Sequence, residues 1–522
     1  MRTSRVLLGA AAGIALVTLA ARVVGFVRVA VLSRTLGTSC VGDVYQSANY
    51  VPNIVFELVA GGALASLVVP MLAGALASGD RAAASRTASA LLPWTVAPLV
   101  PVALLGILAA PLLMRALLGD DPTCAGAIAT GTRMLVVFLP QIVLYGIGIV
   151  VAGVLQAHRR FLGPALAPLL SSLVVITAYL LYAASGAVDE LGQLRRGQEL
   201  VLSVGTTLGV AVLSLGLLVP LRRCGLRLRP TFEFPPGVAV RVRRLAVAGV
   251  AGVAARQVAL VVALRLAATD ARAGSVIVFT VATALFLLPW AVLAVPVATS
   301  VFPRLSESAE AGEEQAYAST SSRGIRVVLL AMTGAAAVLA VAALPVARLL
   351  VRGAPGPESS SALAAATLAF APGLVGYGLL ALLARALYAR SDGRTPATAT
   401  VAGWLVVAVT DLALVAALPD VDRVVLLGIG NTLGMSTAAV LLLLGLRRAA
   451  GAPALAGAVR SGSAGLMAAV LAYLAGSAVP LPDPSLVADL LTAAGTVLLT
   501  TGIFLLVVRL LDPAGLKALL RA

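Results

Sequence analysis

Six ionisable side chains lie inside stretches that are otherwise apolar, and they are the chain's first candidates for chemistry. A charge at the centre of a membrane helix costs about 2.5–3.5 kcal/mol on insertion scales, so each one needs a partner or a water-filled cavity. The six are Arg22, Arg28, Glu57, Arg256, Asp411 and Asp489. Arg28 can snorkel outward, and Asp489 lies near the end of its apolar run, so these two rank below Arg22, Arg256 and Asp411.

Arg22 and Arg28 share one apolar stretch, with Gly25 between them to let other groups approach. Guanidinium groups bind phosphate oxygens through paired hydrogen bonds, so two arginines on one helix suit a bulky anion such as a phosphate or pyrophosphate. The alternative is an internal salt bridge, for example of Arg22 or Arg28 with Glu57. The residues alone leave both interpretations open.

Other reactive groups are few. The three cysteines form no CxxC pair, and we predict no metal site, no cofactor and no catalytic residue. Cys40 and Cys124 both fall in predicted outer loops, where a disulfide is chemically permitted; we favour small free thiols. We interpret His158 as an interfacial residue, not a proton relay. The acids of the outer loops are scattered and no large polar domain accompanies them, so a membrane glycosyltransferase is not expected.

The composition identifies the elements that must position these groups. Hydrophobic residues make up 60% of the 522 positions and charged residues 11%, with a mean hydropathy of +1.04. Runs of about 20 apolar residues can span a bilayer as helices. We therefore predict an all-α polytopic membrane protein with about 14 transmembrane helices, near 6–32, 45–77, 88–118, 126–156, 162–184, 198–221, 242–267, 274–303, 326–351, 362–388, 397–418, 423–446, 462–481 and 486–511.

The basic residues indicate the orientation. Most of the 38 lysines and arginines fall in segments that are cytoplasmic if the N-terminus is cytoplasmic, so the positive-inside rule places both termini there. The net charge of +16 then reports topology, and no nucleic-acid partner is expected. A signal peptide over residues 1–21 is the alternative for the first helix, but the apolar pattern continues through Gly25 to Val31.

A long stretch of the chain occurs twice, 232 positions apart. Phe138, Pro140, Tyr145, Gly146, Leu155, Ala157 and Pro164 return as Phe370, Pro372, Tyr377, Gly378, Leu387, Ala389 and Pro396. A second motif, Gly205–Gly209, returns as Gly430–Gly434. We predict two parallel six-helix repeats, an N-lobe at 1–221 and a C-lobe at 222–446, followed by a C-terminal helix pair at 447–522. Pro140 and Pro372 should kink their helices at equivalent places.

Several ordered motifs resemble those of the MurJ/MviN lipid II flippase family. They are Arg22-Val-Val-Gly25-Phe-Val-Arg28, Leu36-Gly37, Asp43, Val51-Pro52-Asn53, Gly62-Ala63, Val69-Pro70, Phe302 to Ser306, and Leu387 to Pro396. The likeness extends over about residues 6–511.

This resemblance implies the fold of the multidrug/oligosaccharidyl-lipid/polysaccharide exporters, with a cationic cavity between two lobes. The implied activity moves an undecaprenyl-pyrophosphate-linked cell-wall precursor, lipid II, from the inner to the outer leaflet of the bacterial cytoplasmic membrane by alternating access. Protein partners from cell-wall synthesis would fit that role in peptidoglycan biosynthesis and cell shape. The resemblance adds Asp43 and Asn53 to Arg22, Arg28, Glu57 and Arg256 as substrate-binding candidates, and implies a lipid-tail groove at helices 13 and 14.

The chain also departs from the family pattern. Val29 stands where an acid often follows the second arginine, Phe56-Glu57 where basic residues are frequent, and Thr283-Ala284 where an Asp-Arg pair is frequent. The cargo could therefore be another polyprenyl-linked saccharide or amphiphile, or the chain a transport-inactive membrane scaffold.

Some related exporters bind a cation among helices 7, 11 and 12. Here those helices offer Arg256 and Asp411. One hypothesis is that the Arg256 guanidinium replaces that cation and pairs with Asp411. The other is that Arg256 replaces the missing arginine of helix 8 as an anion ligand.

Overall fold

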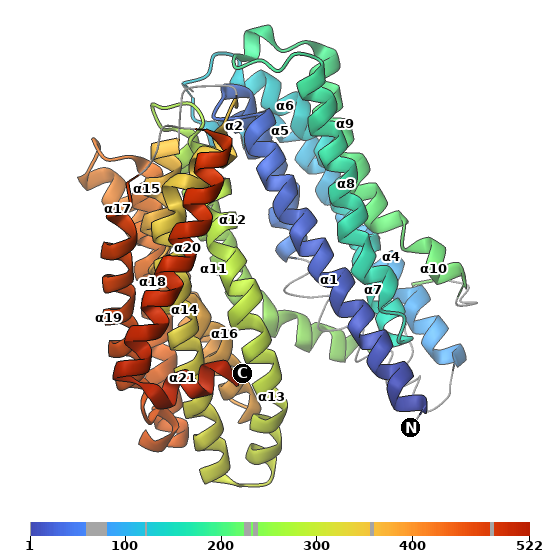
Figure 1. The fold of residues 1–522 in the computed structure, drawn as a ribbon. Helices are drawn as coiled ribbons and strands as arrows, with labels where there is room; N and C mark the ends of the chain where they lie inside the picture. The colour runs from blue at the N-terminus through green and yellow to red at the C-terminus, as the bar shows by residue number, and fades with distance from the viewer. Residues whose placement is uncertain are drawn as a thin grey trace. The chain divides into compact units, whose positions relative to one another are not determined.

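A computed structural model describes residues 2–58, 81–120, 123–223, 231–232, 238–354, 360–480 and 485–521. Every regular element in these ranges is a helix, which agrees with the predicted all-α class (Figure 1). Four residues of the family-like motifs, Gly62, Ala63, Val69 and Pro70, lie outside the described ranges.

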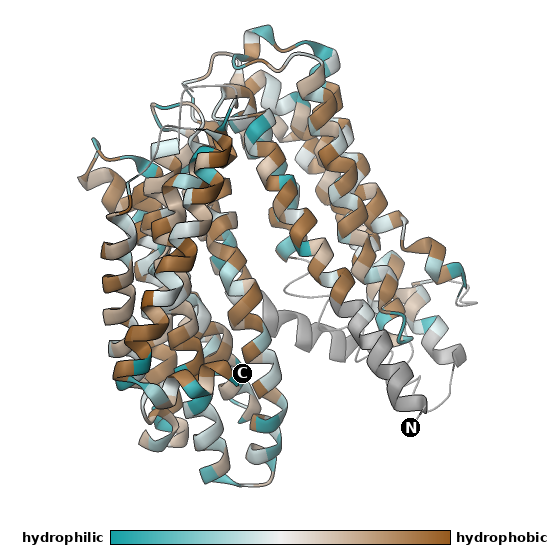
Figure 2. Cartoon of the chain, in the orientation of Figure 1, coloured by the Kyte–Doolittle hydropathy of each residue, from teal (hydrophilic) through white to brown (hydrophobic). Residues whose placement is uncertain are grey.

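The expected membrane spans are largely found. Among the described residues, 12 helices are long and apolar enough to cross a membrane, or 13 if one bent pair counts as a span. They occupy Leu16–Thr35, Ser85–Leu108, Ala127–Ala157, Leu162–Ala184, Arg196–Arg223, Ala251–Ala268, Ser275–Glu310, Glu314–Val351, Arg394–Ala417, Arg423–Ala450, Ala452–Ser477 and Leu486–Leu511. The expected span at 45–77 begins as helix α2 (Cys40–Glu57) and then leaves the described part. Figure 2 shows apolar residues along most of these helices, as lipid contact requires.

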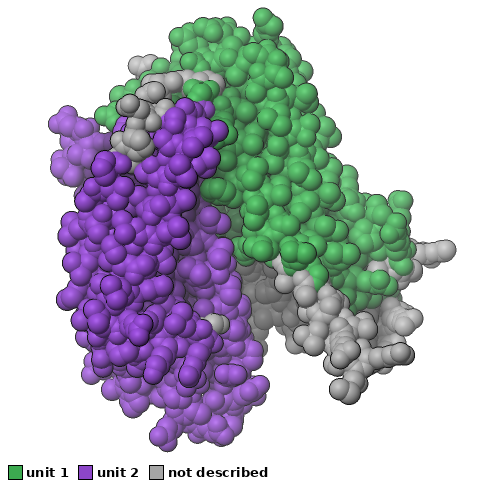
Figure 3. Space-filling model, viewed as in Figure 1, with its two compact units in different colours: residues 1–257, 268–277, 353–357 green, residues 258–267, 278–352, 358–522 purple. Residues whose placement is uncertain are grey.

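The chain forms two compact units, coloured separately in Figure 3. The first comprises residues 1–257, 268–277 and 353–357. Its helices are α1 (Arg2–Thr35), α2, α4 (Arg81–Leu108), α5 (Ala110–Leu118), α6 (Ala127–Phe138), α7 (Gln141–Ala157), α8 (Leu162–Ala184), α9 (Arg196–Leu215), α10 (Leu218–Arg223) and most of α11 (Val238–Ala268). Within this unit α8 packs against both α1 and α9, and α2 packs against α6.

The second unit comprises residues 258–267, 278–352 and 358–522. Its helices are most of α12 (Ser275–Pro289), then α13 (Val295–Glu310), α14 (Glu314–Val351), α15 (Ser360–Phe370), α16 (Gly373–Ala389), α17 (Arg394–Ala417), α18 (Arg423–Ala450), α19 (Ala458–Ser477), α20 (Leu486–Leu511) and α21 (Pro513–Leu520). A π-helical turn, Trp290–Ala294, joins α12 to α13. The C-terminal pair α19 and α20 packs on α14. The predicted lobes follow the repeat, while these units follow packing, so the lobe boundaries stay a prediction.

The two repeat prolines break their helices at equivalent places, as expected. Pro140 directly precedes α7, and Pro372 directly precedes α16. The pair α15 and α16 is bent by 44°. Because proline has no N–H, the preceding turn loses a hydrogen bond, and its carbonyls need other donors.

A threonine of the second repeated motif supplies one such donor in each copy. The Thr207 hydroxyl on α9 lies 3.1 Å from the Val137 carbonyl and 3.0 Å from the Ser203 carbonyl of its own helix, so its one proton is shared between them. The Thr432 hydroxyl on α18 donates to the Ala369 carbonyl at 2.9 Å. Both carbonyls lie three residues before the proline. The two repeated motifs therefore recur together because one completes the hydrogen bonding of the other.

Candidate functional site

Arg22 and Arg28 both project from α1, the first membrane-spanning helix, which packs on α8. Arg22 is exposed and Arg28 is half-buried. Leu19 and Val23 beside Arg22 are 52% and 54% exposed, so this face of α1 is not covered within the unit. Neither arginine forms an ion pair with any residue that the structure describes. The described residues therefore do not neutralise the positive charges of Arg22 and Arg28.

Three tyrosines lie in the neighbourhood of Arg28. Tyr45, Tyr145 and Tyr179 all lie close enough to feel its charge. The Tyr45 hydroxyl lies 2.6 Å from that of Thr206 and 3.0 Å from that of Tyr179. The hydrogen-bond partners of these phenols are one another and neutral side chains, so they leave the charge of the guanidinium uncancelled.

Asn53, another candidate, is tied into the same neighbourhood. The Tyr145 hydroxyl donates to Asn53 Oδ1 at 3.0 Å, while Asn53 Nδ2 donates to the Asn49 carbonyl at 2.6 Å. The Tyr145 ring packs on Phe56 with 4.3 Å between centroids. Asn53 thus positions Tyr145, and a direct substrate role for Asn53 stays a prediction.

Glu57 and Arg256 come together within the first unit. Glu57 Oε2 lies 3.7 Å from Arg256 Nη1, and the two side chains are 45% and 39% exposed. A pair this long and open contributes little to stability. Glu57 therefore lies beside Arg256, and the described residues do not form the alternative salt bridge with Arg22 or Arg28.

Asp43 has a structural partner that the sequence did not reveal. It is 7% exposed, and its carboxylate accepts backbone hydrogen bonds from Gly274 at 2.7 Å, Val276 at 3.0 Å and Ile277 at 3.2 Å. These N–H groups open α12, so Asp43 caps that helix from 231 residues away. The geometry favours a positioning role over the substrate contact expected from the resemblance.

The neighbouring loop corrects the expectation for the cysteines. Cys40 and Cys124 form a disulfide, with 5.6 Å between their Cα atoms, so the favoured free thiols were the wrong interpretation. Beside it, the Thr123 hydroxyl donates to the Asp270 carbonyl at 2.8 Å. The Asp43 cap therefore fastens the connection between α11 and α12 to the start of α2. The disulfide fastens the loop between α5 and α6 to the same place, and Thr123 links that loop to the connection.

Asp411 lies on α17 in the second unit and is 1% exposed. Neither carboxylate oxygen has a hydrogen-bond partner in the described part of the chain. Its pairing with Arg256 would join the two units and stays a prediction. Asp489 is different, because Arg352 at 3.2 Å and Arg348 at 3.8 Å hold it at the start of α20.

Sequence reasoning missed the tyrosines around Arg28. A signal did exist, because Tyr145 is part of the repeated motif, but that motif was interpreted only as scaffold. Tyr45 and Tyr179 carry no comparable pattern. They approach Arg28 through packing of α2 and α8, which a single sequence does not display.

Comparison with known proteins gives consistent matches. Residues 32–492 match the family model described as "Lipid II flippase MurJ". A "Probable lipid II flippase MurJ" of Rhizobium meliloti is 28% identical over 398 residues, covering 73% of this chain and 70% of that protein. A "Lipid II flippase MurJ" of Burkholderia cenocepacia is 28% identical over 444 residues, covering 83% and 82%.

Solved structures agree on the fold. One titled "Lipid II flippase MurJ, inward closed conformation" superposes with a TM-score of 0.75 at 15% identity, covering 95% of this chain and 98% of that one. An inward-facing multidrug resistance MATE family transporter of the MOP superfamily gives a TM-score of 0.68 at 16% identity, covering 84% and 98%.

Proposed function

Because the chain belongs to the lipid II flippase MurJ family, we propose that it moves lipid II from the inner to the outer leaflet of the bacterial cytoplasmic membrane by alternating access. The cargo is an undecaprenyl-pyrophosphate-linked precursor, and both termini face the cytoplasm. Cell-wall synthesis enzymes would supply and consume this cargo. No cofactor or metal takes part in the proposal.

One observation carries the proposal: Arg22 and Arg28 lie in a membrane-spanning helix and have no ion-pair partner among the described residues. Two uncompensated guanidinium groups in an apolar setting are costly, and a pyrophosphate would offset that cost. Glu57 does not neutralise them in the described part, because it lies beside Arg256. For the cycle to advance, the inward and outward states must bind the pyrophosphate with different affinities.

The test is replacement of a host's own flippase by this chain, with surface-exposed lipid II as the readout. We expect the wild type to sustain exposure of lipid II, and Arg22→Ala with Arg28→Ala to reduce it at least tenfold. Arg509→Gln serves as the control, since Arg509 is an exposed arginine at the end of α20. Rescue by the double alanine variant at normal membrane abundance would falsify the anion role.

A second candidate function keeps the transport cycle and changes the cargo to another polyprenyl-linked saccharide or amphiphile. It is favoured by Thr283 and Ala284, which stand where the family often has an Asp-Arg pair. The Thr283 hydroxyl is buried without a hydrogen-bond partner among the described residues. Failure of the correctly inserted wild type to expose lipid II, with retained binding of other polyprenyl pyrophosphates, would select this cargo class. Loss of both would favour a scaffold.

A further inference from the structure

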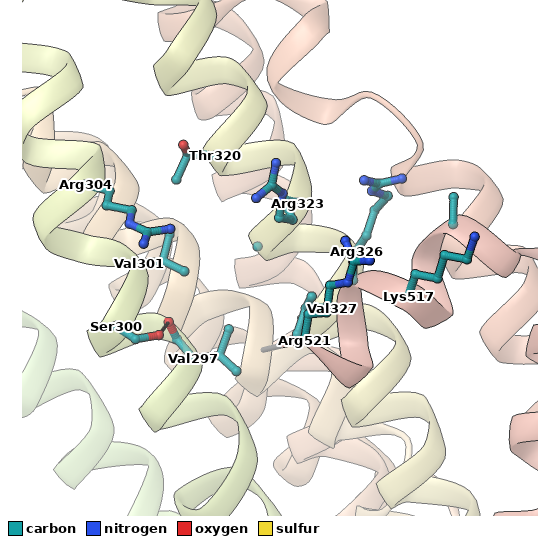
Figure 4. Close-up of a pocket in the computed structure, with 13 residues that line it drawn as sticks. Val297, Ser300, Val301, Arg304, Thr320, Arg323, Arg326, Val327, Lys517 and Arg521 are labelled. Atoms are coloured by element: carbon teal, nitrogen blue, oxygen red, sulfur yellow. Dashed lines mark hydrogen bonds between the residues drawn. The ribbon is translucent and has the colours of Figure 1, made fainter.

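The second unit contains a pocket of about 520 Å³ whose charged lining is entirely basic. Two hydroxyls, those of Ser300 and Thr320, accompany the charges. Figure 4 shows the basic side chains around the pocket; they come from α13, from α14, and from α21 with the residue that directly follows it. They are Arg304, Arg323, Arg326, Lys517 and Arg521.

No acid among the described residues lines the pocket to balance these five cations. None of the five forms an ion pair or a side-chain hydrogen bond with the residues that the structure describes. The Arg326 Nε atom is buried and unpartnered. Like charges held close together repel one another, so an anion in this pocket would relieve repulsion and also complete the hydrogen bonding of Arg326.

The fold holds the wall of the pocket in place. Asp512 starts α21 by accepting hydrogen bonds from the Gly515 amide at 2.9 Å and from the Ser461 hydroxyl on α19 at 2.5 Å. Lys517 lies in the last turn of α21, and Arg521 directly follows the helix as its C-cap. The start of this basic C-terminal helix is thus fixed.

A separate apolar groove of about 500 Å³ lies along the following turns of α14. Val327 lines the pocket and Leu330, one turn later, lines the groove. Groove residues on α14 extend from Leu330 to Val346, a length of about 24 Å at 1.5 Å per residue. That is most of the roughly 30 Å hydrocarbon core of a bilayer. A ligand with an anionic group on a long hydrocarbon chain would suit the basic pocket and the apolar groove together.

We propose that the basic pocket is a docking site for the pyrophosphate of a polyprenyl-linked lipid, whose tail would lie in the groove that the family resemblance implies at the C-terminal helices. The proposal rests on the proposed function, because that function sets the cargo class. Five cations exceed what one phosphodiester charge needs, and they suit the several charges of a pyrophosphate. The pocket belongs to the second unit, whereas Arg22 and Arg28 belong to the first, so it is a second anion site.

Photo-crosslinking on the full chain in phosphatidylcholine nanodiscs tests this site. A benzophenone amino acid replaces Ala518, which lines the pocket, or Leu510, which is 74% exposed and lines neither cavity. The probe is radiolabelled undecaprenyl pyrophosphate. We expect labelling at position 518 to exceed that at 510 at least tenfold.

Removing positive charges from the pocket should abolish the difference in labelling between positions 518 and 510. The combined substitutions Arg323→Gln, Arg326→Gln and Lys517→Gln are expected to lower labelling at 518 at least tenfold, and Arg509→Gln to leave it unchanged. Undiminished labelling of the triple variant overturns the proposal. Equal competition by phosphatidylglycerol, which indicates a general anionic-lipid site, or by inorganic pyrophosphate, which indicates a soluble-anion site, also overturns it.

The flippase replacement assay separates the two proposals. If the wild type exposes lipid II but the triple variant is labelled normally, the docking site fails and the proposed function stands. If the wild type neither exposes lipid II nor binds the probe at any position, both fail.

Discussion

Arg28 illustrates how one charge is placed within a membrane helix. Tyr45, Tyr145 and Tyr179 lie in its neighbourhood, and no acid among the described residues pairs with it. Position within an apolar run was enough to identify Arg28 from the sequence. The tyrosines could not be predicted, because they come from α2, α7 and α8, and their convergence depends on packing between helices distant in the chain.

Substitutions of Asp43 can distinguish a helix-capping role from a cargo-binding role. We expect Asp43→Ala to lower the free energy of unfolding by about 2 kcal/mol, because three backbone N–H groups of α12 lose their buried acceptor. Asp43→Asn keeps one acceptor oxygen and should lose roughly half as much. Thermal and denaturant unfolding of the purified protein measure both.

A different outcome would assign Asp43 to cargo binding. If Asp43→Ala unfolds like the wild type but loses binding of undecaprenyl pyrophosphate, then Asp43 is the substrate contact that the family resemblance implied. The capping role then has no energetic importance.

At the scale of elements, the breaks at Pro140 and Pro372 were predictable because proline acts on its own helix. Their partners were not, since Thr207 and Thr432 lie on other helices. The hydropathy pattern likewise predicted the spans, which follow from local composition. It did not predict the Cys40–Cys124 disulfide, because two isolated cysteines carry no information about distance.

Thr207→Val should destabilise the protein by about 1 kcal/mol, because the Val137 carbonyl beside the proline break loses its donor. Thr432→Val should act alike through Ala369, and the two losses should add, since the residues lie in different units. Unfolding in detergent provides the measurement. Thr207→Ser and Thr432→Ser keep the hydroxyl and are the controls; equal losses in the serine variants would contradict the hydrogen-bond account.

The disulfide should stabilise the element pair that it joins. Its cysteines are 84 residues apart, and closing a loop of that length contributes about 4–5 kcal/mol in the chain-entropy model. We expect Cys40→Ser with Cys124→Ser to lower the melting temperature, and the reduced wild type to behave alike. Cys224→Ser leaves the pair intact and should change nothing. Alkylation of both thiols before reduction would show that the bond is absent from the purified protein.

At the scale of the whole molecule, two similar halves carry different charges. The first glycine of the repeated motif packs against an alanine in one half, where Gly205 faces Ala178, and against an acid in the other, where Gly430 faces Asp411. A Cβ at Gly430 would lie 3.0 Å from the Asp411 carboxyl carbon, so the shared glycine leaves room for the acid. The duplicated scaffold therefore tolerates functional asymmetry without a change of backbone.

That asymmetry bears on the energy source of transport. The family resemblance raises the question of a cation site, because some related exporters are expected to bind a cation among helices 7, 11 and 12. In this chain Arg256 lies on α11 and the buried Asp411 on α17, and their pairing is a hypothesis. If the arginine takes the place of the cation, transport in proteoliposomes should proceed at the same rate with sodium or potassium on either side. Arg256→Gln should then acquire sodium dependence, because Asp411 would need a mobile cation again.

The competing role for Arg256, as an anion ligand, gives a different pattern. Arg256→Gln would then weaken binding of undecaprenyl pyrophosphate about tenfold or more without creating any response to sodium, since removing an anion ligand does not vacate a cation site. The substitution Glu57→Gln further distinguishes the two roles considered for Arg256. It removes the acid 3.7 Å from Arg256, so it should strengthen anion binding if Arg256 is a ligand and leave it unchanged if Arg256 serves Asp411. Strict sodium dependence of the wild type would contradict the cation-replacement hypothesis, because a fixed guanidinium leaves no place for the ion.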